Sequence, residues 1–325
     1  MFISLVEAEA KGVNYPAITP VELGRLKVAF TSNRLEQDAI VAFLDEKLAD
    51  IDRYLAAKQR LIGLLNEQKA IIVERAVTHG LNPNVEMKAS GIEWLGKIPA
   101  HWEAKRAKFL FREVNKRSET GEEELLSVSH ITGVTPRSQK NVNMFLAESY
   151  EGYKTCAPGD LVINIMWAWM GALGVSEYSG IVSSSYGVYR LKHPDLFRRQ
   201  YLDFLLRTKQ YVAEYTTRST GITSSRLRMY TDDFFNVPIL RPPLEEQDEI
   251  LEYIADQTSA IDQSIAQANR EIELIQKLRT VLIAEAVTGK LEVRGNQELE
   301  IGRLGQRRPK RSPGNELPRL LNSAR

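Results

Sequence analysis

Two long segments of the chain, residues 35–81 and 244–291, carry apolar residues in alternating steps of four and three positions. This spacing is typical of the stripe along which one helix of a coiled coil packs on another. Neither segment contains proline, so each predicts one long helix. We expect the contact between the helices to be made by a seam of apolar side chains: Leu44, Ile51, Leu55, Ile62 and Ile72 in the first helix, and Ile254, Ile261, Ile265, Ile272 and Leu282 in the second.

The two segments are also copies of each other. Residues 36–81 align without a gap on residues 246–291, and both copies begin with Glu-Gln-Asp and contain Ala-Val-Thr near their ends. A helix with an apolar stripe is not stable alone in water, and the other copy is its nearest partner. Antiparallel pairing would let the intervening chain leave and return at one end of the pair. In an open alternative, each stripe packs on a globular domain of its own.

The intervening segment, residues 91–243, has a different pattern. Short apolar runs at residues 160–165 and 187–191 are bounded by turn residues and predict strands, whereas residues 198–215 predict a helix. Prolines 238, 242 and 243 precede the second long helix. The sequence therefore predicts an α+β protein in which a mixed α/β domain is inserted at one end of a long antiparallel two-helix coiled coil.

Charge is unevenly distributed along the chain. The chain has 43 Lys and Arg residues and 42 Asp and Glu residues, a net charge of +1, but the two helical segments carry about −2 and −6. The inserted segment carries about +4, and the residues from 292 onward carry another +4. Residues 295–325 are rich in Arg, Pro and Gly without periodicity, so they predict a disordered basic tail. The near-neutral total therefore conceals a basic domain that suits a polyanionic partner.

Two segments of the inserted domain combine basic and hydrogen-bonding side chains without any acid: residues 215–230 and residues 135–143. Hydroxyl groups contact phosphates, arginine binds phosphates or guanine edges, and Gln and Asn pair with adenine, so both segments suit double-stranded DNA. The same composition also occurs in ordinary mobile loops and turns. The candidate DNA-binding residues are Arg137, Gln139, Lys140, Asn141, Arg218, Thr220, Ser224, Ser225, Arg226 and Arg228. Trp167, Trp169 and Tyr186 are expected in the domain core.

The residues that an enzyme would need are missing from the sequence. There is no phosphate-binding loop ending in Gly-Lys-Ser/Thr and no polar-Pro-Pro-aromatic motif of an amino-methyltransferase. Glu103 and Lys105 resemble part of a metal-dependent nuclease site, but a suitable acidic partner is lacking. The single cysteine, Cys156, and four scattered histidines give no metal-ligand spacing. We therefore expect no catalytic residue, no metal and no cofactor.

The sequence also predicts where the protein acts. Its most apolar run, residues 161–175, is too short for a transmembrane helix, and the first ten residues lack the pattern of a secretory signal. We therefore expect a cytoplasmic protein that does not contact membranes.

Several blocks of the chain, in order, resemble one known family. They are GIEWLGKIPAHWE (residues 91–103), the run from Pro158 to Leu191, and RPPLEEQDEI (residues 241–250) followed by a long helix ending in EAVTGKL. These blocks are similar to the specificity subunit of type I restriction-modification systems. The first long helix, with its ending ERAVTHGL, resembles the central conserved helix of that subunit. The resemblance covers about residues 18–293.

The resemblance implies a non-catalytic, sequence-specific DNA-binding subunit. In that family, each target recognition domain reads one half of a bipartite DNA sequence, and the helices set the gap between the halves and bind the methyltransferase subunits. Methylation and cleavage belong to the methyltransferase and restriction/translocase subunits. Residues 91–243 would be a target recognition domain, residues 35–81 the central conserved helix and residues 244–291 the distal conserved helix.

One part of the sequence departs from the family pattern. Residues 1–34 resemble only a remnant of a first target recognition domain, whose closing strand corresponds to residues 18–30. One interpretation is a disrupted gene; another is a naturally short subunit that pairs with itself or with another half-subunit. A rival of a different class is a coiled-coil adaptor or scaffold protein with a protein-binding head. It explains the helices equally well but leaves the two acid-free segments as coincidence.

Overall fold

The computed structural model describes residues 2–12, 16–27, 30–140, 149–223, 226–291 and 293. The chain divides into two compact units. The first unit comprises Met1–Ala56 and Ile272–Arg325, and the second comprises Ala57–Glu271. The boundary between the units passes through both long helices, α3 (Arg34–His79) and α8 (Leu244–Val287). The two units are described separately below.

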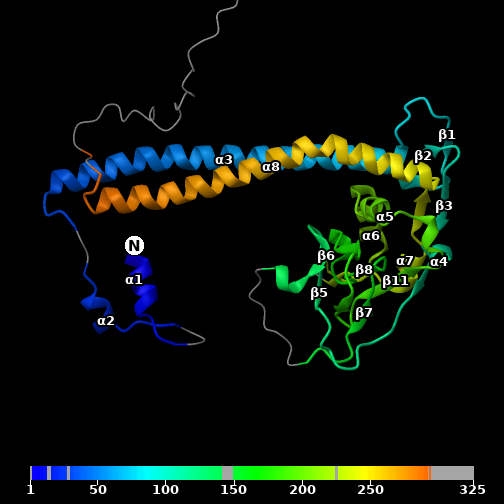
Figure 1. The fold of residues 1–325 in the computed structure, drawn as a ribbon, viewed down its shortest axis with the longest axis horizontal. Coiled ribbons are helices and arrows are strands. Elements are labelled where there is room, and N and C mark those ends of the chain that lie inside the picture. The colour runs from blue at the N-terminus through cyan, green and yellow to red at the C-terminus, as the bar shows by residue number, and fades with distance from the viewer. Residues whose placement is uncertain are drawn as a thin grey trace, which may run out of the picture. The chain divides into compact units, whose positions relative to one another are not determined.

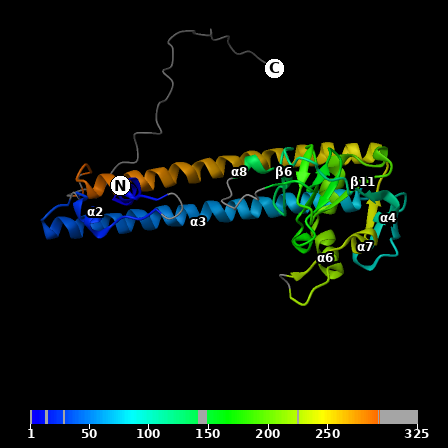
Figure 2. The same ribbon diagram turned by 90° about the horizontal axis from the view of Figure 1, so that it is seen from below.

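The two long helices run antiparallel within each unit (Figures 1 and 2). In the second unit, Lys58 of α3 pairs with Glu271 of α8 at 2.6 Å, and Lys69 pairs with Asp262 at 2.6 Å. In the first unit, Asp52 pairs with Arg279 at 2.9 Å. Within the second unit, residue numbers rise along α3 as those of the partners fall along α8. The predicted antiparallel helix pair is confirmed.

None of the ten seam positions expected from the sequence is fully exposed. Ile51, Ile254 and Ile261 are buried, and the other seven are half-buried. Leu64 and Leu278, which lie off the seam of the same helices, are exposed instead. The seam positions are therefore less exposed than these two off-seam residues.

The first unit also contains two short helices near the start of the chain, α1 (Phe2–Glu9) and α2 (Pro20–Arg25). The α2 helix begins with a capping box: the Glu22 backbone N–H donates to the Thr19 hydroxyl at 3.2 Å, and the Thr19 N–H donates to the Glu22 carboxylate at 3.0 Å. Val21 and Leu23 of α2 nevertheless remain exposed. Local capping therefore forms this helix without burying its apolar side chains.

The rest of the second unit is a mixed α/β domain built from short antiparallel strands. Its central sheet has four strands in the order β4-β11-β8-β9, and four further two-stranded ladders are β1-β2, β3-β12, β5-β6 and β7-β10. The strands are β1 (Met87–Ala89), β2 (Lys97–Pro99), β3 (Glu103–Arg106), β4 (Phe111–Glu113), β5 (Leu126–Ser129), β6 (Gly133–Pro136), β7 (Lys154–Cys156), β8 (Leu161–Ile163), β9 (Leu173–Val175), β10 (Gly180–Val182), β11 (Gly187–Leu191) and β12 (Pro238–Arg241).

The helices of this domain are short. The α-helices are α4 (Ala107–Leu110), α5 (Arg199–Leu206), α6 (Lys209–Arg218) and α7 (Thr231–Phe235), and the 3-10 turns are η1 (Glu93–Leu95), η2 (Arg137–Gln139), η3 (Ala168–Met170) and η4 (Pro194–Leu196). The single helix expected over residues 198–215 is therefore wrong, because α5 and α6 are separate helices. The break occurs where the Thr208 hydroxyl caps α6 by accepting a hydrogen bond from the Tyr211 N–H.

Buried contacts fix the domain to the end of the helix pair inside the second unit. The Tyr201 hydroxyl donates to the Val77 carbonyl of α3 at 2.9 Å, and the Trp102 indole N–H donates to the Glu246 carboxylate of α8 at 2.8 Å. Val77, Trp102 and Tyr201 belong to one hydrophobic cluster of buried residues, and Ile254 of α8 is part of it. Because side chains from α3, the inserted domain and α8 share one core, the domain and this end of the helix pair form one body.

Candidate DNA-binding surface

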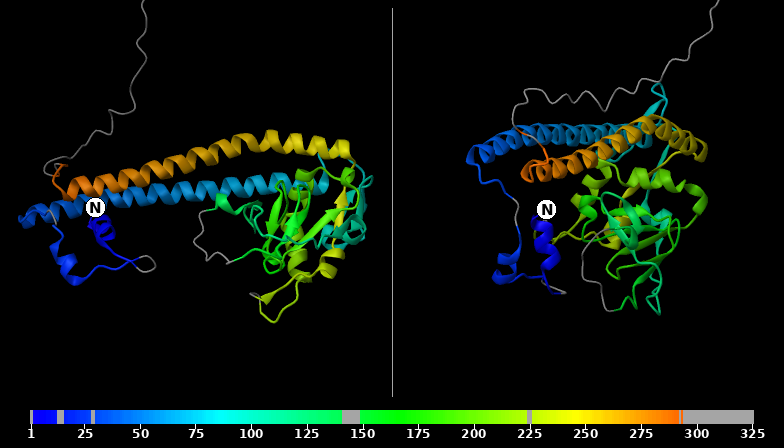
Figure 3. Two further views of the ribbon diagram at one scale, coloured as in Figure 1. Left: turned by 60° about the horizontal axis from the view of Figure 1, so that its bottom comes forward. Right: turned by 60° about the vertical axis from the view of Figure 1, so that its left-hand side comes forward.

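The predicted segment 215–230 is partly helix and partly a small hairpin (Figure 3). The hairpin is closed by Thr220 and Arg228, whose backbone N–H groups each donate to the other's carbonyl at 2.9 and 2.8 Å. A Cβ atom on Gly221 would lie 2.5 Å from the Arg226 carbonyl oxygen, so the tight closure requires glycine. Ile222, one residue beyond Gly221, is 96% exposed.

The structure separates the predicted residues of this segment into different environments. Thr220 and Arg226 are exposed. The expectation of a free loop is wrong for Arg218, which lies in the last turn of α6 and pairs with Glu214 at 2.6 Å. Arg228 is half-buried, and its guanidinium donates to the Leu227 carbonyl at 2.8 Å. The remaining predicted residues of this segment, Ser224 and Ser225, lie outside the described residues.

The second predicted segment follows the β5-β6 hairpin and contains η2. The Lys140 ammonium donates to the hydroxyls of Ser127 at 3.2 Å and Ser129 at 3.3 Å, both on β5. Burial, and secondarily the nearby charge of Arg137, lower the pKa of Lys140. An added anion would relieve that charge repulsion, so the pair of cations is suited to a phosphate.

The predicted residues of this segment differ in exposure. Gln139 is exposed and Arg137 is half-buried, whereas Asn141 lies outside the described residues, as does the predicted tail of residues 295–325. The structure thus describes seven of the ten candidate residues. None of these seven lies in the hydrophobic core clusters.

A chain of contacts joins the two predicted segments. Burial raises the pKa of Tyr186, and the positive charge of nearby Arg137 lowers it in part. The Tyr186 hydroxyl accepts a hydrogen bond from the Asn164 side-chain amide at 3.1 Å. One residue further, the Ile165 carbonyl accepts from the Met229 N–H at 3.0 Å, next to Arg228. The segment from Asn164 to Met170 is therefore bonded directly to the 215–230 segment, and through Tyr186 it comes within the electrostatic influence of Arg137.

Sequence reasoning misplaced one residue of this connecting segment. Trp167 was expected in the core, but its side chain is 50% exposed, whereas Trp169 and Tyr186 are half-buried. The rings of Trp167 and Trp169 stack, with their centroids 6.3 Å apart and an interplanar angle of 15°. An exposed tryptophan at the surface has no signature in the local apolar pattern, because the same run of apolar residues would equally suit a buried turn.

A buried ion pair supports the strand that leads into the connecting segment. Asp160, at the start of β8, is 1% exposed, and its two carboxylate oxygens accept from the Arg190 guanidinium at 2.6 and 2.7 Å. The Ala157 N–H donates to the same carboxylate at 2.9 Å. The Arg190 contacts tie the start of β8 to β11, and the Ala157 contact closes the turn before β8, so these side-chain contacts of Asp160 are structural.

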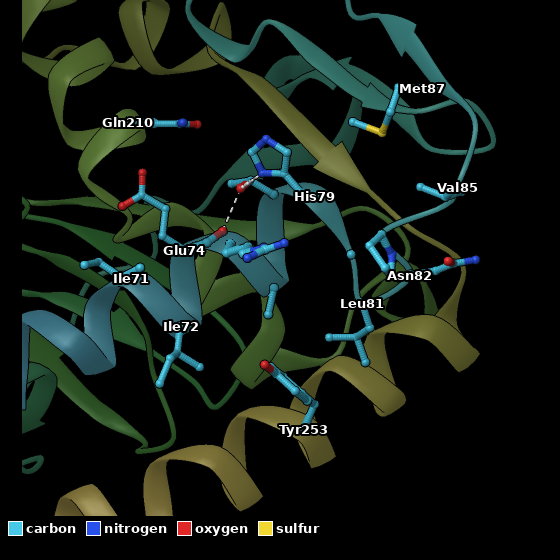
Figure 4. A pocket seen from close by; sticks show the side chains of 15 residues that line it. Ile71, Ile72, Glu74, His79, Leu81, Asn82, Val85, Met87, Gln210 and Tyr253 are labelled. Carbon is cyan, nitrogen blue, oxygen red and sulfur yellow. Dashed lines mark hydrogen bonds between the residues drawn. The ribbon is translucent and has the colours of Figure 1, made fainter.

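A groove of about 910 Å³ lies elsewhere in the second unit, at the carboxyl end of α3 (Figure 4). Ile72, Leu81 and Tyr253 are among its apolar lining residues. The Thr78 hydroxyl beside it donates to the Glu74 carbonyl at 2.6 Å. None of the candidate DNA-binding residues lines this groove.

The long helices expose a second set of apolar side chains apart from the seam. In the second unit, Leu61, Leu64 and Ile71 of α3 are between 40% and 58% exposed. In the first unit, Leu274, Leu278 and Val281 of α8 are between 49% and 56% exposed. Their spacing of three, four and seven residues places each set on one side of its helix. We refer to these six residues as the outer stripes.

Metal-binding and membrane-spanning features are absent from the described part of the chain. No three or more His, Cys, Asp and Glu side chains come together there in a way that could hold a metal ion. No helix among those residues is both long and apolar enough to span a bilayer.

Comparison with known proteins places this architecture beside one class of subunits. No protein-family model matches the chain. The type I restriction enzyme MjaVIII specificity subunit of Methanocaldococcus jannaschii is 24% identical over 307 residues, which cover 90% of this chain and 68% of the relative.

Solved structures of type I restriction-modification proteins have a similar fold. A chain described as "Structural basis underlying complex assembly and conformational transition of the type I R-M system" matches with a TM-score of 0.54 and 17% identity, covering 89% of this chain and 69% of that chain. The HsdS subunit from Thermoanaerobacter tengcongensis matches with a TM-score of 0.39 and 19% identity, covering 89% of this chain and 68% of that chain. In sequence and in fold, the chain is similar to the specificity subunits of type I restriction-modification systems.

Proposed function

We propose that the chain is the non-catalytic DNA-recognition subunit of a cytoplasmic type I restriction-modification complex. The inserted domain reads one half-site of a bipartite target. The observation that carries this proposal is the joined surface described above, where two acid-free segments with Arg137, Lys140 and Arg226 flank one connecting segment. Together with the similarity to a type I specificity subunit, this surface favours duplex DNA over a protein partner.

The first experiment measures binding of the purified full chain to DNA. Short random duplexes are selected for retention, and the affinity for the recovered half-site is measured across a salt series. We expect affinity to fall steeply between low and moderate salt, because contacts to phosphates release counterions. A chain that retains no duplex at low salt would support the alternative function, a coiled-coil adaptor with a protein-binding head.

Arg226 gives the sharpest test of sequence reading. Replacement of Arg226 by Ala is expected to weaken half-site binding by about 1–3 kcal/mol and binding to random duplex much less, since arginine can pair with a guanine edge. Arg226→Lys is the matched control, because it keeps the charge but loses the bidentate geometry. Equal losses on both duplexes with Arg226→Ala would reduce Arg226 to a phosphate contact.

The helix pair is proposed to dock the methyltransferase subunits, which in turn bring the restriction/translocase subunit. The outer stripes support this proposal, because six apolar side chains stand exposed on otherwise acidic helices. Leu64→Glu in the second unit and Leu278→Glu in the first should each abolish copurification with a co-expressed type I methyltransferase subunit. Phe109→Glu, at a 61% exposed position of α4, serves as the control. Retained copurification with both outer-stripe variants would count against docking on these faces.

Pairing with a second specificity half-subunit belongs to the same proposal. The support comes from comparing two short capped helices. In α7 the apolar residue Phe234 is fully buried, whereas in α2 the apolar residue Leu23 is exposed. A second copy of this chain or another specificity chain would cover that apolar surface. Light scattering of the purified chain tests this: a dimer that Leu23→Asp dissociates supports the proposal, and a concentration-independent monomer opposes self-pairing.

A further inference from the structure

Trp167 is presented to solvent on a fixed backbone. Its N–H donates to the Asn164 carbonyl at 2.9 Å, and its own carbonyl accepts from Met170 at 3.0 Å and from Ala172 at 3.1 Å. The stacked neighbour Trp169 is held by its indole N–H, which donates to the Met166 carbonyl at 3.1 Å. A side chain on such a backbone loses little further freedom when it binds a partner.

The tip of the adjoining hairpin presents a second apolar side chain. Ile222 is 96% exposed, and its hairpin is tied to the Trp167 segment by the hydrogen bond from the Met229 N–H to the Ile165 carbonyl. The Thr216 hydroxyl at the end of α6 also donates to the Trp169 carbonyl at 3.0 Å. The two apolar side chains therefore stand on neighbouring segments of one surface.

The surroundings of these side chains indicate the chemistry of what covers them. The segments 164–170 and 219–230 contain no acid, and Arg226 is exposed on the same hairpin as Ile222. A ligand that suits such a surface is anionic overall but offers apolar groups locally. On the major-groove edge of duplex DNA, the apolar group is the thymine methyl at C5.

We propose that Trp167 and Ile222 read DNA by apolar contact with thymine methyl groups in the major groove. This inference rests on the proposed DNA-binding function and adds the base chemistry that the two side chains recognise. Arginine and hydroxyl side chains of the same surface contact phosphates and polar base edges, whereas Trp167 and Ile222 distinguish thymine from cytosine by its methyl group.

The test uses the half-site recovered by selection with the full chain, synthesised with thymine or with uracil at each thymine position. Uracil keeps every hydrogen-bonding group of thymine and lacks only the methyl. The wild-type chain is expected to lose on the order of fourfold in affinity at one or more positions, the value of one buried methyl group. Ile222→Ala and Trp167→Ala should each bring the thymine-to-uracil affinity ratio towards one at the thymine that the replaced side chain contacts.

Controls separate a reading role from a structural one. Trp167→Phe keeps an aromatic face and should retain part of the ratio, and Phe109→Ala should keep the wild-type ratio in full. If Trp167→Ala lowers the melting temperature of the protein, Ile222→Ala still decides the matter, because Ile222 contacts little of the protein.

The outcomes distinguish this inference from the proposed function. Selective half-site binding with equal affinity for thymine and uracil duplexes overturns the methyl contact and leaves the DNA-binding function intact. An undiminished ratio in both the Ile222→Ala and Trp167→Ala variants also overturns it. If the Ile222→Ala and Trp167→Ala variants lose copurification with the methyltransferase subunit but keep the thymine-to-uracil affinity ratio, the two side chains contact a protein instead. No binding to any duplex would remove the proposed function and this inference together.

Discussion

The helix pair and the inserted domain use charge in different ways. Along the helices, ion pairs such as Lys69–Asp262 lie at the surface, where both partners keep much of their contact with water. In the domain, Asp160 is buried, and its carboxylate is held by Arg190 and a backbone N–H. Surface pairs contribute little to stability, whereas a buried carboxylate depends on its partners. The helices are therefore held by their apolar seam, and the domain depends on buried polar contacts as well.

The largest expected effect breaks the seam. Ile261→Asp places a charge at a position that is 8% exposed, and we expect it to lower the free energy of unfolding by ~3 kcal/mol or more. Ala260→Asp is the matched control, since it adds the same charge to the exposed neighbouring position. Chemical denaturation of the two variants measures the difference. Similar stabilities would show that the seam is not what holds the helices.

A smaller effect is expected in the domain. Asp160→Asn removes the charge that holds Arg190, and we expect a loss of about 2 kcal/mol, less than for a fully buried pair, because Arg190 is 40% exposed and remains solvated. The melting temperature should fall without loss of the helical signal in circular dichroism. An unchanged melting temperature would mean that the hydrogen bonds of Asp160 matter more than its charge.

The smallest effect is expected for the surface pairs of the helices. Lys69→Met should change the free energy of unfolding by less than about 1 kcal/mol, because Lys69 and Asp262 are 33% and 51% exposed. A double-mutant cycle with Asp262→Asn would isolate the coupling between the two side chains. If the coupling free energy of Lys69 with Asp262 exceeded that of Asp160 with Arg190, the surface ion pairs of the helices would contribute more to stability than the buried ion pair of the domain.

Two similar short helices show where local sequence stops being informative. In α2 the carboxylate of Glu22 accepts the Thr19 N–H, and in α7 the carboxylate of Asp233 accepts the Tyr230 N–H at 3.1 Å. The α2 cap matches the Thr-x-x-Glu pattern that can be recognised from sequence, whereas the α7 cap begins at a tyrosine and does not match it. Phe234 of α7 is nevertheless buried against β-strand neighbours, whereas Leu23 of α2 is exposed. Burial depends on a partner surface, which local sequence does not specify.

The candidate surface shows the same limit. Composition was sufficient to single out Arg226 and Lys140, because acid-free runs of basic and hydroxyl residues are visible in the sequence. It did not reveal that Glu214 already pairs with Arg218, although a spacing of four residues on a helix would have suggested it. It also missed Trp167, because the exposure of a turn residue depends on the segments that surround it.

The long helices and the face that each must cover could be derived from the chain alone, since a repeated four-three spacing encodes both, whereas the structure decided that the two helices pair with each other. The joining of two basic segments through Tyr186, Asn164 and Met229 could not. These residues are up to 65 positions apart in sequence and meet only because the sheet and α6 bring them together. Periodic contacts repeat a local rule, whereas a binding surface assembled from separate loops exists only when the whole domain has folded.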